Sequence, residues 1–231
     1  DAALTVGGEG AATTGARVVG GEYVDSRTGI AVAAATGTRI EGVAVTGNGG
    51  SLQFGVGIEL GDRYDAVQNT TVVGGTVAGN GVGVVAENTT ETTVRGVAIR
   101  ENFATGVDVR GGTDVSVRRN GGGIQLRPGP FGPVDGVVIR DSAVVRSGVS
   151  GEYRGEIGPF VGTGIAALGT QDLLVTRTNV SENLLFGVAY GTEREAVEGP
   201  EQQERSARSQ NGTIRDVTAR RNGALGVGVD G

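Results

Sequence analysis

The chain has 231 residues, of which 45 are glycine and only 4% are aromatic, and its 20 basic and 26 acidic side chains give a net charge of −6. Cysteine, histidine and methionine are absent, which excludes a disulfide framework, a thiolate nucleophile and a histidine base or metal ligand. The acidic balance argues against a general nucleic-acid binder, and no apolar run reaches the ~18 residues of a membrane-spanning helix.

A short pattern of glycine, apolar, variable and apolar residues recurs along the whole chain. Its copies are 29–32, 57–60, 81–84, 106–109, 123–126, 164–167, 187–190 and 226–229, with a degenerate earlier copy at 4–6. Further short apolar runs lie between the copies, so each repeat is predicted to hold three short strands of period two. A strand this short buries its apolar face only when copies stack on either side, which predicts a solenoid.

The spacing of the copies predicts where the solenoid is irregular. Most copies lie about 23 to 28 residues apart, but the repeat between Val107 and Ile124 is short and is expected to lack one strand. Two repeats are long, and they predict loops at 127–135, 150–163 and 191–211. The last loop is polar and charged, with one helical turn expected at 193–197.

An asparagine precedes most of the glycine-led strands. These asparagines are Asn48, Asn80, Asn102, Asn120, Asn183 and Asn222. Asparagine tolerates the left-handed backbone of a tight turn, and its amide can bond to equivalent amides above and below. The sequence therefore predicts a stacked asparagine turn.

The repeat length, the three strands and the lack of a helical period resemble right-handed parallel β-helices, specifically the degenerate repeats of pectate-lyase-like and NosD-like proteins. The resemblance implies an all-β, single-stranded right-handed parallel β-helix of about 8–9 coils, formed by one domain over residues 1–231. Because residue 1 is not methionine and Gly231 follows directly after a strand, we expect a fragment whose last coil meets further chain or a partner.

The variable residue of each copy is expected to face solvent, so that these residues form one column along the outside of the solenoid. The predicted column is Ala31, Glu59, Gly83, Asp108, Gln125, Ala166, Ala189 and Gly228. Arginines that follow two of these strands, and aromatic residues on the loops, are expected beside it. A face with guanidinium groups, carboxylates and exposed rings suits a sugar chain. The predicted carbohydrate-binding residues are Glu59, Tyr64, Asp108, Arg110, Gln125, Arg127, Phe131, Tyr153 and Phe160.

Three functions remain open from the sequence. The first is a noncatalytic surface stalk or adhesin-like module that binds a polysaccharide or surface glycan. The second is a polysaccharide lyase, in which the resemblance implies Arg110 or Arg127 as the base, with Asp108 and a calcium ion. The third is a purely structural scaffold, since polar residues are expected on the solvent face of any β-helix. No metal site and no other cofactor is predicted, because metal-binding and catalytic motifs with histidine or repeated aspartate are missing.

Two further expectations concern the surroundings of the protein. Four Asn-X-Ser/Thr acceptors, at Asn69, Asn88, Asn179 and Asn211, suit a glycosylated extracellular or cell-surface protein. All basic residues are arginine, and this feature together with the acidic balance resembles proteins of salt-adapted archaea, although a coding bias towards G and C would have the same effect.

Overall fold

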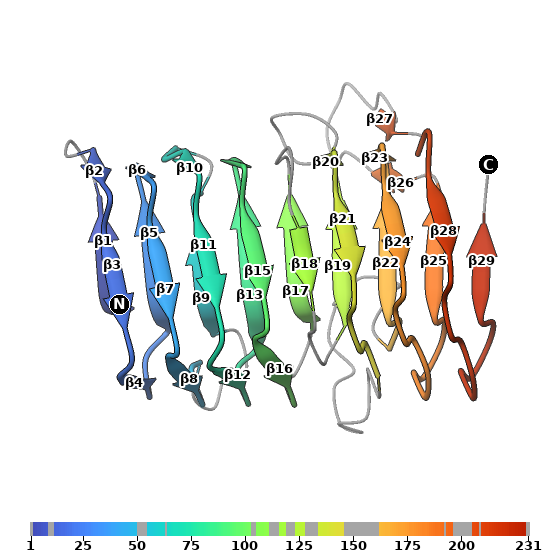
Figure 1. Ribbon diagram of the computed structural model, residues 1–231, viewed down its shortest axis with the longest axis horizontal. Coiled ribbons are helices and arrows are strands. Elements are labelled where there is room, and N and C mark those ends of the chain that lie inside the picture. Colours follow the sequence, from blue (N-terminus) through green and yellow to red (C-terminus); the bar gives the residue numbers. More distant parts are fainter. Residues whose placement is uncertain are drawn as a thin grey trace, which may run out of the picture.

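The computed structural model describes residues 2–8, 12–49, 55–62, 64–102, 105–110, 116–118, 123–127, 134–145, 162–191, 193–195, 205–207 and 209–229. These residues form strands and turns, and they include no helix. The strands stack side by side along a rod whose two termini lie at opposite ends (Figure 1). The chain is therefore an all-β parallel β-helix, as the sequence predicted.

The longest sheet, which we call sheet A, contains one strand from each of nine coils, all parallel. Its strands are β1 (Ala2–Gly7), β5 (Thr28–Ala33), β9 (Val56–Leu60), β13 (Val82–Glu87), β17 (Thr105–Arg110), β19 (Ile124–Arg127), β22 (Ile165–Leu168), β25 (Val188–Gly191) and β29 (Val227–Val229). Val6, in the expected degenerate copy, pairs with Val32, so that copy is confirmed.

Sheet C has eight parallel strands of three residues each and forms a second face of the rod. They are β3 (Arg17–Val19), β7 (Arg39–Glu41), β11 (Thr71–Val73), β15 (Thr93–Arg95), β18 (Ser116–Arg118), β21 (Val138–Arg140), β24 (Leu174–Thr176) and β28 (Thr213–Arg215). The central residue of each strand with a described side chain points inward, as Ile40 and Ile139 do, both of which are fully buried.

Two shorter sheets, B and D, complete the coils in the N-terminal half. Sheet B contains β2 (Thr13–Thr14), β6 (Ala35–Thr36), β10 (Val67–Gln68) and β14 (Thr89–Thr90), and a separate pair is formed by β20 (Val134–Asp135) and β23 (Thr170–Gln171). Sheet D contains β4 (Glu22–Val24), β8 (Ala44–Thr46), β12 (Thr76–Ala78) and β16 (Ala98–Arg100). A complete coil thus has four strands, and the predicted three is wrong because two-residue strands leave no period-two pattern to detect.

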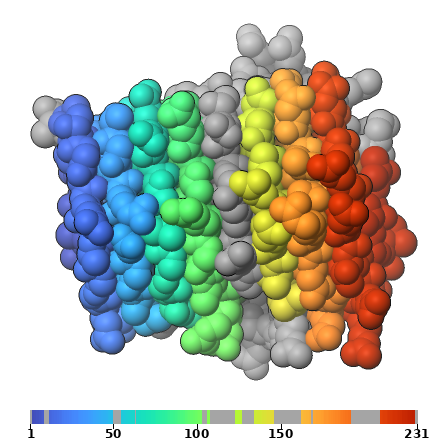
Figure 2. All heavy atoms as spheres, viewed as in Figure 1, coloured from blue at the N-terminus to red at the C-terminus, as the bar shows by residue number. Residues whose placement is uncertain are grey.

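The core is a single column of aliphatic side chains that runs along the axis of the rod. Its largest fully buried members are Ile30, Ile40, Ile58, Leu60, Ile99, Ile124, Leu126, Ile139, Ile165 and Leu173. Each packs against its equivalents in the neighbouring coils, as Ile58 does between Ile30 and Val84. In Figure 2 the described coils appear as adjacent bands along the body.

Stacked asparagines link successive coils at the turn that leads into sheet A, as predicted. Asn48 Nδ2 donates to Asn80 Oδ1 at 2.9 Å, and Asn80 Nδ2 donates to Asn102 Oδ1 at 3.0 Å. The same Oδ1 atoms accept the backbone N–H of the preceding asparagine, at 3.0 and 3.1 Å. Asn183 and Asn222 repeat this pair of bonds near the C-terminus. Asn120 lies outside the described residues.

The glycine that opens each sheet A strand is explained by this asparagine stack. A Cβ atom at Gly57 would lie 2.5 Å from the carbonyl oxygen of Gly83 and 2.9 Å from Nδ2 of Asn80. Both distances are shorter than real Cβ contacts, so any side chain would push the two coils apart. The glycine-led pattern therefore marks the point where consecutive coils approach most closely.

Two of the sequence predictions about the repeats are wrong. Val85, not Gly83, lies in register with Glu59, so the copy that was predicted at 81–84 lies at 83–86. The alternating run from Gly81 to Val85 fits both registers, which explains the error. The expected helical turn at 193–197 is also wrong, because β26 (Glu193–Glu195) pairs antiparallel with β27 (Arg205–Ala207).

The lack of a strand in the short repeat stays a prediction, because Gly123 is the only residue that the structure describes between β18 and β19. β16 is the last described strand of sheet D. The same side of the rod continues as isolated parallel bridges that join Ala143 to Asn179 and Asn179 to Thr218. Among the described residues, sheet D is therefore interrupted between β16 and Ala143.

Turns between the sheets contain residues with a left-handed backbone. At the corner between sheets C and D the left-handed residue is glycine in four coils and charged in three later ones. The residues are Gly20, Gly42, Gly74 and Gly96, followed by Asp141, Arg177 and Asp216, with φ between 48° and 64°. A non-glycine residue in this conformation costs about 1 kcal/mol or more, so the three charged corners are strained.

Substitution of Asn80 tests the asparagine stack. Asn80 is fully buried, and Asn80→Ala removes bonds to Asn48, Asn102 and the carbonyl oxygen of Val45. We expect the free energy of unfolding to fall by about 2–5 kcal/mol in urea denaturation, because buried amide groups lose their partners. Asn211→Ala, at an exposed corner, is the matched control, and an equal loss in both variants would contradict a structural role for the stack.

Candidate functional site

The structure tests how the predicted outward column on sheet A is arranged. Glu59, Val85, Asp108 and Gln125 occupy one register position on consecutive strands, and Ala166 follows them. The column is not open along its whole length, because three of its small residues are buried. Val85 is 8% exposed, Ala166 2% and Ala189 9%.

The predicted carbohydrate residues are only partly brought together. Arg110 and Arg127 lie in register, as do Asp108 and Gln125, so the backbone places these four as expected. The structure describes no side-chain positions for Asp108, Arg110 or Arg127. Phe131, Tyr153 and Phe160 lie outside the described residues. A role for any of these residues in binding or catalysis therefore stays a prediction.

Tyr64 is presented to solvent by a tight turn after β9. Oδ1 of Asp62 accepts the backbone N–H groups of Tyr64 at 2.7 Å and of Asp65 at 2.8 Å, which fixes the turn. The Tyr64 side chain is 81% exposed. This geometry suits the predicted stacking role of an aromatic ring, because the backbone that holds the ring is already ordered.

Glu59 is the one predicted residue with a perturbed carboxyl group. Burial, together with the nearby Asp62 and Glu87 carboxylates, raises the pKa of Glu59 above its usual 4.5, although a hydrogen bond from Thr28 opposes the shift. The Thr28 hydroxyl donates to Glu59 Oε2 at 3.4 Å. The nearby charge of Arg27 also opposes the shift. The described residues hold no group of three or more potential metal ligands around Glu59 or elsewhere.

Three of the four predicted glycosylation asparagines occupy left-handed corners. Asn69, Asn88 and Asn211 have φ of 49°, 51° and 56°. The corner itself favours asparagine there, whatever the modification state. Asn179 differs, because it lies on the D side and its Oδ1 accepts the hydroxyl of Ser181 at 2.6 Å. Glycosylation of all four remains a prediction.

Arginines are concentrated in the strands of sheet C, a feature that was not predicted from the sequence. The structure describes no side-chain position for Arg118, so that residue is assigned to the sheet by its backbone alone. The charged residues of its eight strands are Arg17, Arg39, Arg95, Arg118, Arg140 and Arg215, against the single acid Glu41. On sheet A the balance is reversed, with Glu59, Glu87 and Asp108 against Arg110 and Arg127. Positive charge is therefore concentrated on one face of an acidic protein.

Four of these arginines form a row along one edge of sheet C. Arg95, Arg118 and Arg140 are directly in register on consecutive strands, and Arg215 lies two strands beyond Arg140. We call Arg95, Arg118, Arg140 and Arg215 the arginine row. Strands pair at about 4.8 Å, and like charges directly opposite each other destabilise a sheet. Arg140 Nε is buried without a hydrogen-bond partner in the described part of the chain.

The signal for this row is present in the sequence. Each member follows the central aliphatic residue of its strand, as in Val94-Arg95, Val117-Arg118, Ile139-Arg140 and Ile214-Arg215. The repeat was aligned on the glycine-led strands of sheet A, where the motif is longest, so the recurrence of arginine on shorter strands was missed.

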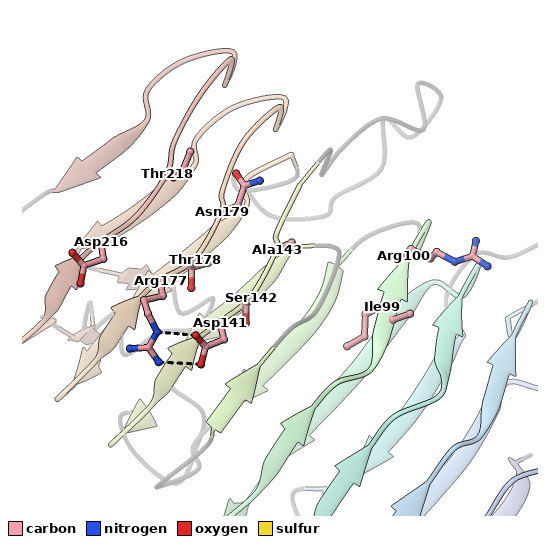
Figure 3. Close-up of a pocket in the computed structure, with 11 residues that line it drawn as sticks. Ile99, Arg100, Asp141, Ser142, Ala143, Arg177, Thr178, Asn179, Asp216 and Thr218 are labelled. Carbon is pink, nitrogen blue, oxygen red and sulfur yellow. Dashed lines mark hydrogen bonds and ion pairs between the residues drawn. The ribbon is translucent and has the colours of Figure 1, made fainter.

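A cleft of about 770 Å³ lies beside β16. Ile99 and Arg100 of β16 line one side, and Asp141, Arg177 and Asp216 lie on the other, on three successive coils (Figure 3). The Arg177 guanidinium donates hydrogen bonds to both carboxylate oxygens of Asp141, at 2.7 and 3.0 Å. This contact, reinforced by the charge of Asp216, raises the pKa of Arg177.

Substitution of Glu59 gives a pH-dependent prediction. The native state holds the Glu59 proton to higher pH than the unfolded state, so ionised Glu59 opposes folding at neutral pH. Glu59→Gln should therefore raise the free energy of unfolding at neutral pH, and the gain should vanish as the pH falls through the raised pKa to below about 4.5. Thr28→Val should enlarge the pH dependence. Urea denaturation between acid and neutral pH checks both, and a gain that does not vary with pH would contradict the assignment.

Comparisons with known proteins identify the fold alone. No protein-family profile matches the chain, and no curated protein matches it by sequence. The structure is similar to PfbA, a surface adhesin of Streptococcus pneumoniae, with a TM-score of 0.51, 11% identity and coverage of 76% of this chain and 51% of that chain. It also matches the A-module of the mannuronan C-5 epimerase AlgE6 of Azotobacter vinelandii, with a TM-score of 0.41, 18% identity and coverage of 98% and 55%.

The chain spans about half the length of both solved structures. Neither comparison supports the expected archaeal origin. No helix among the described residues is long and apolar enough to cross a membrane. The chain shares its fold with a surface adhesin. A function for this chain has to be argued from its own surface residues.

Proposed function

We propose that this chain is a noncatalytic β-helix module of a cell-surface protein that binds an acidic polysaccharide along the outer face of sheet C. The observation that carries the proposal is the charge of that face, six arginines against Glu41, in a chain whose net charge is −6. A guanidinium group matches a carboxylate or sulfate with two parallel hydrogen bonds. The arginine row would repeat such a contact from coil to coil.

Not all six arginines are equally available to a ligand. Glu41 already accepts hydrogen bonds from Arg17 at 3.1 Å and from Arg39 at 3.0 Å, and these contacts lower the pKa of Glu41. Arg95 and Arg140 make no ion pair among the described residues. The middle of sheet C, where β15 and β21 carry Arg95 and Arg140, is therefore the better site for an anionic chain.

A saccharide fits this face better than a nucleic acid. Single-stranded nucleic acids bind to grooves in which bases stack on aromatic rings, and no strand of sheet C contains an aromatic residue. The Thr93 hydroxyl lies two residues before Arg95 on β15 and matches the hydroxyl-rich edge of a sugar chain. The negative net charge also opposes the dense charge of a nucleic acid.

The cell-surface location belongs to the same proposal. Its support is the description of PfbA, which shares the fold, as a surface adhesin, and the four Asn-X-Ser/Thr acceptors. The noncatalytic assignment is supported by the absence of histidine from the chain. The lyase alternative, with Arg110 or Arg127 as base and Asp108 beside them, is tested in the same experiment.

Binding to polygalacturonate and to heparin, measured by isothermal titration calorimetry, tests the proposal, with neutral dextran as the reference polymer. We expect binding to at least one acidic polymer that weakens as salt is added, because exposed charges are screened. The variant Arg95→Gln/Arg140→Gln should lose about tenfold or more in affinity, which corresponds to 1.4 kcal/mol or more. Arg17→Gln is the matched control and should change the affinity little, since Arg17 is already paired with Glu41.

Other outcomes would contradict the proposal. Ultraviolet absorbance from unsaturated products, lost in Arg110→Ala or Arg127→Ala, would establish the lyase. Tighter binding to single-stranded DNA than to either glycan would establish a nucleic-acid binder. If the chain binds none of the polymers, the remaining alternative is a purely structural scaffold.

A further inference from the structure

The cleft beside β16 is a second surface, separate in chemistry from the arginine row. β16 pairs with β12 and is the last described strand of sheet D, and Ala143, which is bridged to Asn179, lines the other side of the cleft. The described lining is a mixture of aliphatic and polar groups from four coils. Its members are Ala98, Ile99, Arg100, Asp141, Ser142, Ala143, Arg177, Thr178, Asn179, Asp216 and Thr218.

The positive charges of this lining are already neutralised. Arg177 is held by both oxygens of Asp141, and Arg100 donates to Glu101 at 2.8 Å. Asp216 acts on Arg177 through its charge but makes no hydrogen bond or ion pair among the described residues. An anionic ligand would therefore find a carboxylate and no unpaired guanidinium.

The remaining polar groups offer hydrogen bonds without charge. Thr178 and Ser142 are buried, with hydroxyls that donate to carbonyl oxygens of their own coils at 2.9 Å, so they shape the wall. Asn179 and Thr218 are exposed on consecutive coils, bridged to each other through their backbones. Together with Asp216 they present an amide, a hydroxyl and a carboxylate at one side of the cleft.

The corners between sheets C and D bring charge to the border of the cleft. Four earlier coils place glycine at this corner, and the coils that border the cleft place Asp141, Arg177 and Asp216 there. Left-handed residues other than glycine also occur at corners away from the cleft, as at Ala34 and Glu91, so it is the charge of these three corners that distinguishes them.

We propose that this cleft binds a neutral saccharide and that Asp141 determines this specificity by occupying Arg177. The Asp216 carboxylate accepts hydrogen bonds from sugar hydroxyls, Asn179 and Thr218 add polar contacts, and the exposed Ala98 and Ala143 contact the apolar faces of the sugar rings. With Asp141 in place, the guanidinium of Arg177 acts as a structural group of the wall. This site is independent of the acidic-glycan face proposed above.

The test uses the chain with the whole arginine row replaced, Arg95→Gln/Arg118→Gln/Arg140→Gln/Arg215→Gln, so that acidic ligands report on the cleft and not on the row. Cellohexaose, maltohexaose, mannohexaose and xylohexaose are the neutral probes, hexagalacturonate is the anionic probe and a chitosan hexamer is the cationic one. Calorimetry should detect binding of at least one neutral probe and none of hexagalacturonate. Asp216→Asn should weaken the neutral binding about tenfold or more, because a charged acceptor is lost.

Removal of the Asp141 carboxylate leaves the Arg177 guanidinium without this partner, so it becomes available to an anionic ligand. In the same background, Asp141→Gly should bind hexagalacturonate, and Asp141→Gly/Arg177→Gly should lose that binding again. Glycine is native at this corner in four coils, so both variants are expected to fold, and thermal unfolding checks this. Asp141→Asn is a second variant that frees Arg177 while it keeps the size of the side chain.

Each result decides the inference separately from the proposed function. Binding of no neutral probe, stronger binding of the chitosan hexamer than of every neutral probe, or hexagalacturonate binding with Asp141 intact would overturn it. Loss of acidic-polymer binding in the parent chain, with neutral binding retained, would overturn the proposed function and leave the cleft site standing.

Discussion

The close vertical stacking of asparagines on glycine-led strands is the constraint from which the other features of this molecule follow. Each carboxamide bonds to the coil before it and the coil after it, and the neighbouring glycine lets the two backbones meet. Because the stack fixes the height and register of each coil, equivalent residues fall into straight columns along the rod. Cores, corners and charged rows are all consequences of this alignment, since a residue type repeated in the sequence becomes a continuous strip on the surface.

The repeat was readable from the sequence wherever one strand was long enough to show its period. Glycine-led strands such as 29–32 and 57–60 predicted sheet A, and the asparagines before them predicted the asparagine stack. Two-residue strands such as Ala35–Thr36 were not recognisable, because two residues carry no alternation, and a run such as Gly81 to Val85 fits two registers equally well.

The candidate surfaces were harder to predict, and the reason is geometric. The longest strand of each repeat has the clearest sequence pattern, so the ligand-binding face was predicted on sheet A. Two residues of that predicted face, Val85 and Ala166, are buried. Arg95 and Arg140 lie on three-residue strands, and their alignment becomes evident only when the register of sheet C is known. The pairing of Asp141 with Arg177 joins residues 36 positions apart, which local sequence patterns do not reveal. Net charge was similarly uninformative, because the sum of −6 conceals one positive face.

The left-handed corners have a consequence for how such a protein changes over evolutionary time. A corner residue lies outside the core and belongs to one coil, so its replacement leaves the aliphatic column untouched. Four coils carry glycine at the C–D corner and three carry charge, within one continuous fold. Corner residues can therefore be replaced one coil at a time, by selection or by engineering, and each replacement changes the surface without changing the scaffold.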